Sequence, residues 1–513
     1  MTRNASRYPD KIAAVSTTRK TTYRELDRRV NMLANAMTRL GIRESDHVGV
    51  LCSNSIEYLE IAYACAKMKA VSLHINWRLT SGEIRYFLRG DKVGALFADG
   101  DLTQSYSGLL IGGALPPICV CVGGELPGAS PYEQLLAAES AEYTAKSVSD
   151  DDILMHINSS GTTGIPKSIL YTHRSMVSEI LCYTMHTNLY RETVFQQMSP
   201  MFHSAALGAY SAIGAGATVV LPRAFQVGEY LRLLQQERVT RIAVVPKMLR
   251  QLLEHPELDH SDLSSLDTIT YSGSPMPAEL IDLAVGRFHC DFYQSYGMTE
   301  MGPVISVLFP EDHKEKTARS LRHRYSVGRA LIGTDIRVVD DEGNDCVTGQ
   351  VGEIIARGYG MMQGYHNMPE ATAKALRGGW YYSGDMGYFD EFGYLFLVGR
   401  RTDMIISGGE NIYPVEVEDC IRMLSADVEE VAVAGLPDAE WGEAVTAFIV
   451  KRAGSTLTAE QVIRHCMKHI ASYKKPQAVY FVNELPKNAS GKVVKKRLRK
   501  EFPAIRAENK TAY

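Results

Sequence analysis

The sequence predicts an α/β fold, with a large N-terminal domain of parallel sheets covered by helices and a small α+β domain at the C-terminus. Two observations support this prediction. Helical and strand patterns alternate through the first half of the chain, as they do where helices cover the faces of a parallel sheet. The chain also has 513 residues, which is too long for one hydrophobic core and indicates two or more domains.

The first predicted elements show the alternation clearly. The segment TTYRELDRRVNMLANAMTRLG has apolar residues at helical spacing, begins with a Thr capping signal and ends at Gly41, so it predicts a helix. The run HVGVLCS predicts a buried strand, and EYLEIAYACAKMKA predicts the next helix. Farther along, TRIAVVPKMLRQLLEH repeats the order, with a strand that leads into a helix.

The character of the sequence changes near residue 375. The segment GGWYYSGDMGYFDEFGYLFLVGRR is rich in glycine and aromatic residues, with turns at short intervals, and it predicts β-hairpins. After Arg400 the pattern indicates a compact α+β unit that ends in the basic run KVVKKRLRK. A domain boundary is therefore expected near residues 399–403.

Composition and charge exclude several classes of protein. The chain is 45% hydrophobic and 22% charged, which is typical of a globular enzyme and unlike a disordered or fibrous protein. The formal net charge of −4 gives no electrostatic basis for binding nucleic acid or an anionic membrane. No apolar run reaches transmembrane length, so no integral membrane association is expected. Nine scattered cysteines without a signal peptide indicate reduced thiols and a cytoplasmic location.

The stretch SSGTTGIPKS, residues 159–168, predicts a phosphate-binding loop. Its glycines let consecutive N–H groups converge on an anion, its threonines add hydroxyl donors, and its lysine adds a mobile positive charge. Pro166 stands where a Walker A loop has glycine, so the loop differs from that motif. A surface turn with a solvated lysine is the alternative interpretation. The candidate phosphate contacts are Ser160, Gly161, Thr162, Thr163, Gly164 and Lys167.

Further motifs follow this loop in a fixed order. They are MFHSAALG (201–208), YSGSPMP (271–277), YQSYGMTE (293–300), YYSGDMG (381–387), LVGRRTDMI (397–405), SGGENIYPVEVE (407–418) and PKNASGK (486–492). With SSGTTGIPK, this ordered set resembles the adenylate-forming superfamily of AMP-forming acyl-CoA synthetases, peptide-synthetase adenylation domains and beetle luciferases. The resemblance covers nearly the whole chain.

The resemblance implies a domain organisation as well as an activity. An adenylation domain with a small barrel-like β subdomain is expected over residues 1–399, a hinge over 400–403 and a mobile C-terminal domain over 404–513. The implied reaction uses ATP with Mg²⁺ to convert a carboxylic acid to an acyl-adenylate, and then transfers the acyl group to CoA. The implied enzyme class is an AMP-forming acid–thiol ligase.

The family's motifs also imply roles for individual residues. Glu300 is the expected Mg²⁺ ligand, since hard cations prefer carboxylate oxygen, and Thr299 would hydrogen-bond the α-phosphate. Lys492 is the expected catalytic lysine of the C-terminal domain, where a positioned cation relieves repulsion between a carboxylate and a phosphate. A solvated helix start is the alternative for Lys492. The expected contacts to adenine and ribose are Gly273, Ser274, Pro275, Gln294, Tyr296, Asp385 and Arg400.

Other motif residues are expected to contact CoA and the acyl group. Gly408 and Gly409 would leave room for the pantetheine arm of CoA, and Trp441 would pack near that arm unless it is an ordinary packing residue. The expected acyl-pocket residues are His203 and Gly297. His203 could equally be a hydrogen-bonded core residue.

The sequence departs from the family pattern at three positions. Thr402 stands at the hinge, where the family usually has Asp or Lys, and its β-branched side chain restricts backbone rotation. Ser168 stands after Lys167, where the family commonly has Gly or Ala, and Asn158 stands before the two serines, where many relatives have Thr or Tyr. None of these changes removes a charged group that the reaction needs. They raise the question of how efficiently the chain uses ATP or rotates its C-terminal domain.

Several functions therefore remain open within this resemblance. The main prediction is a ligase for a medium-to-long or bulky alicyclic acid, because the small residues of HSAALGAYSAIGAGATVV would leave volume in the acyl pocket. Those residues could instead allow close helix packing. The alternatives are a thioesterification-only ligase that accepts a pre-formed adenylate, an enzyme that loads a carrier protein, a luciferase-type monooxygenase, and a non-catalytic nucleotide-binding relative. A homodimer is possible by analogy alone.

Overall fold

The structure is a computed structural model of the chain, and it describes residues 1–159, 167–274, 276–314, 323–438, 440–487 and 493–508. Two compact units share the chain. Unit 1 contains Met1–Ile336 and Ala356–Tyr381, and unit 2 contains Arg337–Ile355 and Tyr382–Tyr513. The predicted hinge and the boundary at residue 399 stay predictions, because a division by contacts does not locate a rotation.

The first sheet of unit 1 has eight strands in the order β19-β9-β8-β4-β3-β5-β6-β7. Its strands from β8 to β7 are parallel, whereas β9 runs antiparallel to β8 and β19 antiparallel to β9. The strand bounds are β3 His47–Leu51, β4 Val71–His74, β5 Ala95–Asp99, β6 Ile118–Val122, β7 Ser130–Pro131, β8 Ile153–Ser159, β9 Lys167–Thr172 and β19 Gly364–Tyr365.

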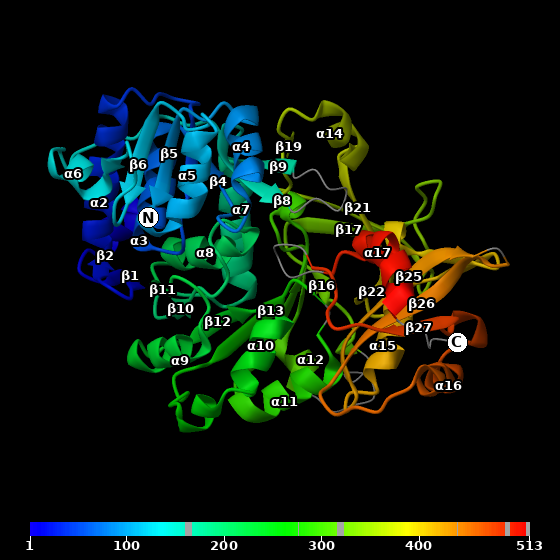
Figure 1. Ribbon diagram of the computed structural model, residues 1–513. Coiled ribbons are helices and arrows are strands. Elements are labelled where there is room, and N and C mark those ends of the chain that lie inside the picture. The colour runs from blue at the N-terminus through cyan, green and yellow to red at the C-terminus, as the bar shows by residue number, and fades with distance from the viewer. Residues whose placement is uncertain (160–166, 275, 315–322, 439, 488–492, 509–513) are drawn as a thin grey trace. The chain divides into compact units, whose positions relative to one another are not determined.

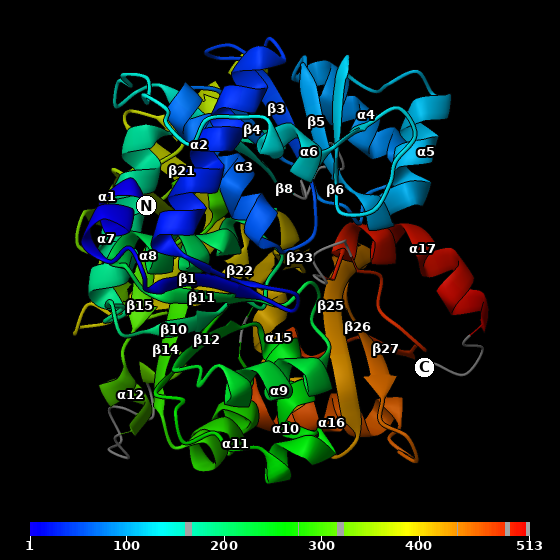
Figure 2. The same cartoon turned by 90° about the vertical axis from the view of Figure 1, so that its left-hand side faces the viewer.

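Helices cover both faces of this sheet (Figures 1 and 2). On one face lie α2 (Tyr23–Arg39) and α3 (Ile56–Met68), and on the other lie α4 (Ser81–Gly90) and α5 (Thr103–Ile111). Alternate strand residues face the two layers: Val48 and Val50 belong to the core with α2 and α3, and Leu51 to the core with α4 and α5. A strand buried on both faces is apolar without alternation, as HVGVL is.

The second sheet of unit 1 has nine strands in the order β16-β15-β14-β13-β12-β10-β11-β1-β2. The strands from β14 to β1 are parallel, and β15, β16 and β2 add antiparallel edges. The strand bounds are β1 Ile12–Ser16, β2 Lys20–Thr22, β10 Val194–Gln196, β11 Thr218–Leu221, β12 Arg241–Val244, β13 Thr268–Ser272, β14 Asp291–Tyr296, β15 Ser306–Leu308 and β16 Arg329–Ala330.

The largest core of unit 1 lies between these two sheets. Helices α7 (His173–His186) and α8 (Leu207–Ala215) share it with α2 and α3, while α9 (Val227–Gln236), α10 (Pro246–Leu253) and α11 (Ala278–Phe288) cover the outer face of the second sheet (Figure 1). The shorter helices of unit 1 are α1 Thr2–Arg7, α6 Tyr132–Ala137, α12 Pro310–Lys314 and α14 Pro369–Ala375.

A further five-stranded sheet corresponds to the predicted small β subdomain. Its order is β17-β18-β21-β20, with β22 paired to β21. The strands β21 and β22 form the hairpin predicted from the glycine- and aromatic-rich segment. The strand bounds are β17 Thr334–Val339, β18 Gly352–Gly358, β20 Leu376–Arg377, β21 Trp380–Phe389 and β22 Leu395–Arg400. The chain passes from one unit to the other within β17, β18 and β21.

The C-terminal part of unit 2 is the predicted α+β unit. Its sheet has the order β24-β23-β26-β25, with β27 parallel to β26. Helices α15 and α16 pack in one core of this sheet, and Leu498 of α17 packs in a second core. The bounds are β23 Ile405–Ser407, β24 Glu410–Ile412, α15 Pro414–Arg422, β25 Val428–Asp438, β26 Gly442–Lys451, α16 Ala459–His469, β27 Ala478–Phe481 and α17 Lys495–Glu508.

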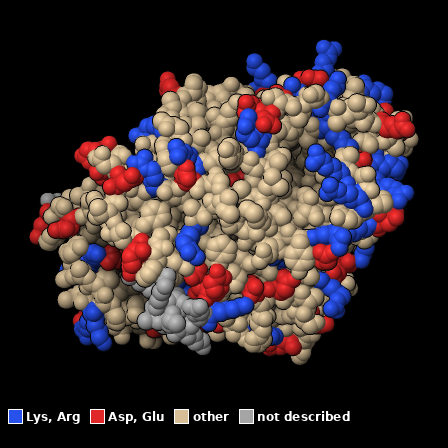
Figure 3. Space-filling view, turned by 180° about the vertical axis from the view of Figure 1, so that it is seen from behind, with Lys and Arg blue, Asp and Glu red and all other residues tan. Residues whose placement is uncertain are grey.

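These elements confirm the predicted fold class and the early helices and strands. Thr22 caps α2 by accepting a hydrogen bond from the backbone N–H of Glu25, and Gly41 after the helix has a φ of 92°. No described helix is both long and apolar enough to cross a membrane. The face drawn in Figure 3 carries acidic and basic side chains intermixed, in keeping with a net charge of −4.

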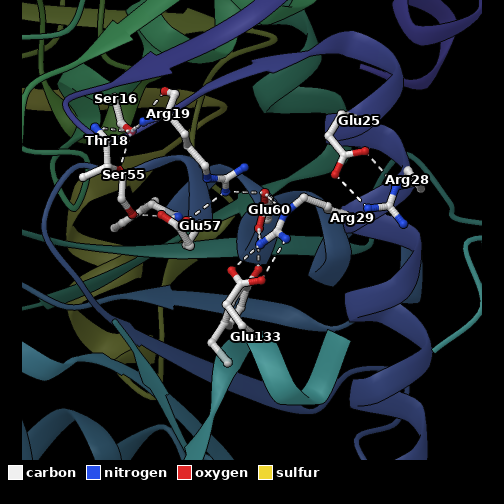
Figure 4. A network of polar contacts seen from close by, with 12 residues as sticks. Ser16, Thr18, Arg19, Glu25, Arg28, Arg29, Ser55, Glu57, Glu60 and Glu133 are labelled. Atoms are coloured by element: carbon white, nitrogen blue, oxygen red, sulfur yellow. Dashed lines mark hydrogen bonds and ion pairs between the residues drawn. The ribbon is translucent and has the colours of Figure 1, made fainter. Parts of the chain in front are cut away.

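A buried ionic network joins α2, α3 and α6 in unit 1 (Figure 4). The carboxylate of Glu60 is fully buried and lies 2.7 Å from Arg29 Nε and 2.9 Å from Arg19 Nη2. It also accepts a 2.7 Å hydrogen bond from the hydroxyl of Tyr132. Glu133 pairs with the same Arg29 at 2.7 Å. Charge and hydrogen bonds are therefore satisfied around the buried carboxylate, as a buried charge requires.

We predict that Glu60→Ala destabilises unit 1 far more than Glu25→Ala does. Removal of Glu60 leaves Arg29 buried with one carboxylate fewer, and breaking a buried pair in this way costs about 3–5 kcal/mol. Glu25 pairs with Arg28 on the surface of α2, where such pairs contribute at most about 1 kcal/mol. The measurement is the thermal unfolding midpoint of each variant. Equal midpoints for the two variants would contradict the prediction.

A second buried carboxyl group lies beside a tight loop of unit 1. Glu179 of α7 is 2% exposed, and its Oε2 has no hydrogen-bond partner among the described residues. A Cβ atom at Gly302 would lie 2.3 Å from Glu179 Cγ, and one at Gly360 would lie 2.0 Å from Glu179 Oε1. A side chain at either position would require Glu179 to move, and Gly302 also has a φ of 102°. Burial raises the pKa of Glu179 to about 8, although a backbone hydrogen bond from Val304 opposes the shift.

The raised pKa predicts that unit 1 loses stability as the pH rises. The folded chain holds a proton on Glu179 between the ordinary pKa and about 8, and the unfolded chain does not. This contribution is therefore complete below the ordinary pKa and is lost as the pH rises through about 8. Glu179→Gln cannot ionise, so its unfolding midpoint should fall less than that of the parent between about pH 6 and pH 9. Parallel curves for the two proteins would show that Glu179 has an ordinary pKa.

Candidate active site

Two neighbouring parallel strands bring several predicted nucleotide contacts to one edge of the second sheet. Ser272 at the end of β13 is in register with Ser295 near the end of β14. Gly273 and Ser274 follow β13, and Gly297 follows β14. The carboxyl ends of parallel strands meet at one edge, which is where ligands bind in open α/β sheets. Gln294 and Tyr296, both partly exposed, belong to β14 at this edge.

The chain turns back sharply after β14. A Cβ atom at Gly297 would lie 2.1 Å from the carbonyl oxygen of Pro303, so no other residue fits there without a backbone shift. The backbone N–H of Ile305 donates to the carbonyl of Tyr296 at 2.8 Å and closes the turn. Between these points the chain forms the short 3₁₀-helix η4, Thr299–Met301. Gly297 was predicted to line the acyl pocket, and the close approach of Pro303 is a separate structural reason for glycine at this position.

Three hydroxyl groups hold Thr299 and Glu300 in place. The hydroxyl of Tyr171 donates to the backbone carbonyl of Thr299, and Ser204 Oγ lies 3.3 Å from Thr299 Oγ1. The hydroxyl of Tyr365 donates to Glu300 Oε1 at 2.9 Å. The backbone N–H of Met362 donates to the carbonyl of Glu300 at 2.9 Å. Tyr365 of β19 thus orients the Glu300 carboxylate, while Tyr171 of β9 and Ser204 hold the neighbouring Thr299.

Lys167 lies beside the same tyrosine. Strand β9 pairs antiparallel with β19, so that Ile169 is in register with Tyr365. The ammonium of Lys167 lies 4.3 Å from the centre of the Tyr365 ring, within the range of a cation–π interaction. In unit 1, Tyr365 therefore contacts both predicted residues. Its ring faces the phosphate-loop lysine, Lys167, and its hydroxyl binds the predicted Mg²⁺ ligand, Glu300.

A buried tyrosine–histidine pair lies beside Gln294. The hydroxyl of Tyr271 lies 3.3 Å from Gln294 Oε1 and 2.9 Å from His313 Nε2. His313 Nδ1 donates to the carbonyl of Phe309 at 2.8 Å. Burial lowers the pKa of His313 to about 4, so the ring is neutral and its Nε2 accepts a hydrogen bond from Tyr271. Because the Tyr271 hydroxyl has one proton, it cannot donate to Gln294 Oε1 at the same time, so this pair lies beside Gln294 at the sheet edge without fixing the orientation of its amide.

The small residues of the 203–220 segment pack tightly against their neighbours. Seven consecutive residues of α8, 207–213, are buried. A Cβ atom at Gly208 would lie 2.5 Å from the ring of Phe195, and one at Gly214 would lie 3.1 Å from Ile180 Cγ2. This geometry favours the close-packing interpretation of these small residues. His203 at the start of the segment has Nδ1 3.3 Å from Ser204 Oγ, which links it to Thr299.

In unit 2, the two predicted ribose contacts are paired with each other. Asp385 of β21 and Arg400 of β22 are in register, and Asp385 Oδ1 lies 2.6 Å from Arg400 Nε. The Asp385 side chain is 11% exposed and the Arg400 side chain 43% exposed. The carboxylate is thus held in a fixed position in the hairpin, and the guanidinium retains access to solvent.

The predicted CoA contacts also lie together in unit 2. Gly408 and Gly409 form the turn between β23 and β24 with φ angles of 59° and 86°, as a two-residue hairpin turn requires. The backbone N–H of Gly408 donates to the carbonyl of Trp441 at 2.8 Å, and a Cβ atom at Gly408 would lie 2.9 Å from the indole. Trp441 is 44% exposed. An indole face against a glycine turn is a surface on which a thin ligand can lie.

The three departures from the family pattern lie in ordinary secondary structure. Thr402 is exposed in the 3₁₀-helix η5, Arg401–Asp403, whose Arg401 pairs with Glu353 at 3.1 Å. Asn158 and Ser168 are in register across β8 and β9, and Ser168 Oγ donates to Asn158 Oδ1 at 2.8 Å. The two unusual residues on either side of the loop thus form a pair.

Some predicted residues lie outside the part of the chain that the structure describes. They are Ser160, Gly161, Thr162, Thr163, Gly164, Pro275 and Lys492. Conversely, Tyr171, Ser204 and Tyr365 contact the site but were not predicted from the sequence. Ser204 lies within the motif MFHSAALG, and Tyr171 lies shortly after the phosphate-loop motif. Tyr365 belongs to none of the motifs, and only the pairing of β19 with β9 shows that it reaches the site.

Comparison with known proteins agrees with this architecture. A family model described as "AMP-binding enzyme" matches residues 1–366, and one described as "AMP-binding enzyme C-terminal domain" matches residues 416–492. The chain is 36% identical over 483 residues to a feruloyl-CoA synthase from an Amycolatopsis species, covering 94% of each protein. It is 34% identical over 492 residues to the long-chain-fatty-acid–CoA ligase FadD13 of Mycobacterium tuberculosis, covering 95% of this chain and 94% of that protein.

A solved structure extends the comparison to the fold. The o-succinylbenzoate-CoA synthetase MenE from Bacillus subtilis, in complex with its acyl-adenylate intermediate, superposes with a TM-score of 0.84 at 27% identity, covering 97% of each chain. The predicted superfamily is confirmed, and the predicted enzyme class is supported at the level of a CoA ligase. On the strength of a match over most of its length, together with the site geometry at β13 and β14, the chain belongs to the AMP-binding enzyme family.

Proposed function

We propose that this chain is an AMP-forming ligase that activates a carboxylic acid with Mg·ATP and transfers the acyl group to CoA. The observation that best supports the proposal is the arrangement around Tyr365, which binds Glu300 through its hydroxyl and Lys167 through its ring. A carboxylate and an ammonium held beside the same tyrosine suit a metal–polyphosphate ligand. The ATP and CoA named here are substrates of the reaction.

Glu300 has the properties that a Mg²⁺ ligand needs. Its Oε1 already accepts one hydrogen bond from Tyr365, and carboxylate oxygens can accept more than one partner. The side chain is only partly buried, so phosphate oxygens and water can complete the coordination of the ion. When bound with ATP, Mg²⁺ would neutralise charge on the phosphates. Tyr365 would keep the carboxylate in the orientation for this contact.

In the first step, a carboxylate oxygen of the acid attacks the α-phosphorus of ATP. The bond from that phosphorus to the bridging oxygen breaks, and pyrophosphate leaves with the electron pair. Thr299, which contacts Ser204 and Tyr171, would donate a hydrogen bond to the α-phosphate. Lys167 would attract the pyrophosphate, and Lys492 would offset the negative charge between the two reacting groups.

In the second step, the CoA sulfur attacks the acyl carbon of the adenylate. The bond from that carbon to the phosphate oxygen breaks, AMP leaves, and the thiol proton passes to solvent. The Gly408–Gly409 turn and the exposed face of Trp441 would guide the pantetheine arm to this carbon. The mixed anhydride is already activated, so positioning contributes most of the rate. Rotation about residues 400–403 between the steps is part of the proposal.

The identity of the acid is the finer part of the proposal. A medium-to-long or bulky alicyclic acid follows from the small residues near His203, although α8 packs closely at Gly208 and Gly214. Related proteins are named for feruloyl, succinylbenzoyl and long-chain fatty acyl groups, and these names favour a bulky apolar acid over acetate. Aryl acids therefore belong in any test beside alicyclic and fatty acids.

A two-armed assay with mass-spectrometric detection of acyl-CoA tests the proposal. One arm receives a panel of acids with Mg·ATP and CoA, and the other receives the matching synthetic acyl-adenylates with CoA. Product in both arms is the expected result and identifies the acid. Product from adenylates alone would establish the thioesterification-only alternative. Binding of ATP with no product in either arm across all three acid classes would contradict a ligase.

The Lys492→Ala variant should separate the two arms of this assay. If Lys492 offsets charge between the carboxylate and the α-phosphate, its loss lowers the rate of the first step by ~100-fold or more, as loss of a preorganised electrostatic contact does. The second step, measured from a synthetic adenylate, should change by less than ~10-fold. Lys500→Ala, in the helix that follows, is the matched control and should leave both arms unchanged. Equal loss in both arms would assign Lys492 a general structural role.

Tyr365→Phe should lower kcat/KM for Mg·ATP by ~10-fold or more, because a hydrogen bond to a charged group contributes ~1.5–3 kcal/mol. The substitution keeps the ring beside Lys167 and removes only the hydroxyl that orients Glu300. Tyr86→Phe, a half-exposed tyrosine on α4, is the control. The measurement is the steady-state rate over a range of Mg·ATP concentrations. An unchanged kcat/KM would show that the Tyr365 hydroxyl is dispensable.

A further inference from the structure

A cluster of three histidines and an aspartate lies inside unit 1, next to the strands that flank the phosphate loop. Asp91 follows α4, His156 belongs to β8, His366 follows β19, and His47 begins β3. Asp91 is 4% exposed and His156 is 1% exposed, whereas the side chain of His366 is 22% exposed. The ring centres of His156 and His366 are 4.7 Å apart, and those of His47 and His156 are 4.8 Å apart.

The ring nitrogens of two of these histidines converge on one carboxylate oxygen. His366 Nε2 lies 3.2 Å from Asp91 Oδ1, and His156 Nδ1 lies 3.6 Å from the same oxygen. The second distance is too long for a hydrogen bond, and His156 Nδ1 has no hydrogen-bond partner among the described residues. An unsatisfied, fully buried ring nitrogen costs free energy unless a ligand meets it. It therefore requires an explanation.

The separations between Asp91 Oδ1 and the two ring nitrogens also suit the ligands of a shared metal ion. Two ligands at ~2.0–2.2 Å from a tetrahedral ion are ~3.3 Å apart, close to both separations from Asp91 Oδ1. The ligand atoms of Asp91, His156 and His366 all lie within 4.8 Å of one another. Two imidazoles and one carboxylate are a ligand set that Zn²⁺ and neighbouring divalent metals accept, with a fourth position left for water.

We propose that Asp91, His156 and His366 form a binding site for a divalent transition-metal ion such as Zn²⁺. His366 offers the route of entry, since it is the one ligand of the three with a partly exposed side chain. This site is separate from Glu300, which is the proposed contact for the ion that accompanies ATP. The proposal concerns binding of the metal and does not depend on the proposed ligase activity.

The contacts around Asp91 are those of an oriented metal ligand. Ser168 Oγ lies 3.1 Å from Asp91 Oδ2, the carboxylate oxygen that does not face the two histidines. His47 Nδ1 donates to the backbone carbonyl of Asp91 at 2.5 Å. Hydrogen bonds of this kind fix the orientation of metal-binding side chains, and their loss typically weakens metal binding by ~10–100-fold.

The same contacts give the unusual residues Ser168 and Asn158 a role. Ser168 Oγ lies between Asp91 and Asn158, and the pair is in register across β8 and β9. Ser159 ends β8 and Lys167 begins β9, and both belong to the predicted phosphate loop of residues 159–168. A metal ion at this site would therefore be linked by hydrogen bonds to both strands that hold the loop.

The test is a titration of the full chain, freed of metal by chelation, with Co²⁺ followed by competition with Zn²⁺. Four-coordinate Co²⁺ has visible absorption bands that report its ligands directly. We expect saturable binding and displacement by Zn²⁺. His366→Ala should weaken this binding by more than ~100-fold, because it removes a metal ligand. Ser168→Ala removes only a hydrogen bond to the ligand Asp91 and should weaken binding by ~10-fold.

A matched control comes from the other described group with three potential ligands, Cys420, His465 and His469 in unit 2. There His465 Nε2 already donates to the carbonyl of Cys420 at 3.0 Å, so His469→Ala should leave the Co²⁺ spectrum and affinity unchanged. Asp91→Asn provides a second ligand variant in case His366→Ala does not fold, as judged by circular dichroism. Absence of Co²⁺ binding to the parent chain, or binding unchanged in folded His366→Ala and Asp91→Asn, would overturn the proposal.

Discussion

The candidate active site depends on the sharp turn of the chain at Gly297. The backbone of Pro303 approaches so closely that a Cβ atom at Gly297 would lie 2.1 Å from its carbonyl oxygen. This approach returns the chain to the sheet as β15 and leaves Thr299 and Glu300 on the short helix at the edge. A side chain at position 297 would force the turn open. The Thr299 hydroxyl would then no longer face Ser204, and the Glu300 carboxylate would no longer face Tyr365.

The turn alone does not explain the order of the site, because two other parts of unit 1 are attached to it. Tyr171 reaches Thr299 from β9, and Tyr365 reaches Glu300 from β19, which pairs with β9. Glu179 fills the space between Gly302 and Gly360 from α7. The strand that begins with Lys167 is therefore tied to the turn through side chains. Displacement of β9 or of the turn would therefore disturb both Lys167 and Glu300.

Sequence reasoning predicted the fold class, the early α and β elements and the family, because each rests on local patterns or on motifs that stay in order. The helix Tyr23–Arg39 and the strand His47–Leu51 have apolar patterns that the tertiary structure does not override. The sequence could not predict Tyr365, His156 or His366 as contacts. These residues meet others 65 or more positions away, in an arrangement that no local pattern encodes. The close approach of Phe195 to Gly208 favours the alternative interpretation of the small residues, which is close helix packing.

The two departures beside the phosphate loop acquire a physical meaning only in three dimensions. Taken separately, Ser168 and Asn158 are two departures from the family pattern at the ends of the predicted phosphate loop. In the structure they bond to each other, and Ser168 also contacts a buried aspartate that two histidines approach. A hydroxyl has one proton and cannot donate to both Asn158 Oδ1 and an ionised Asp91 at once. The position of that proton depends on the charge near Asp91, and a cation bound there would weaken the pull of the carboxylate on it. The loop strands and the aspartate–histidine cluster are therefore electrostatically coupled, and the substitutions are better understood as parts of one polar network than as separate losses.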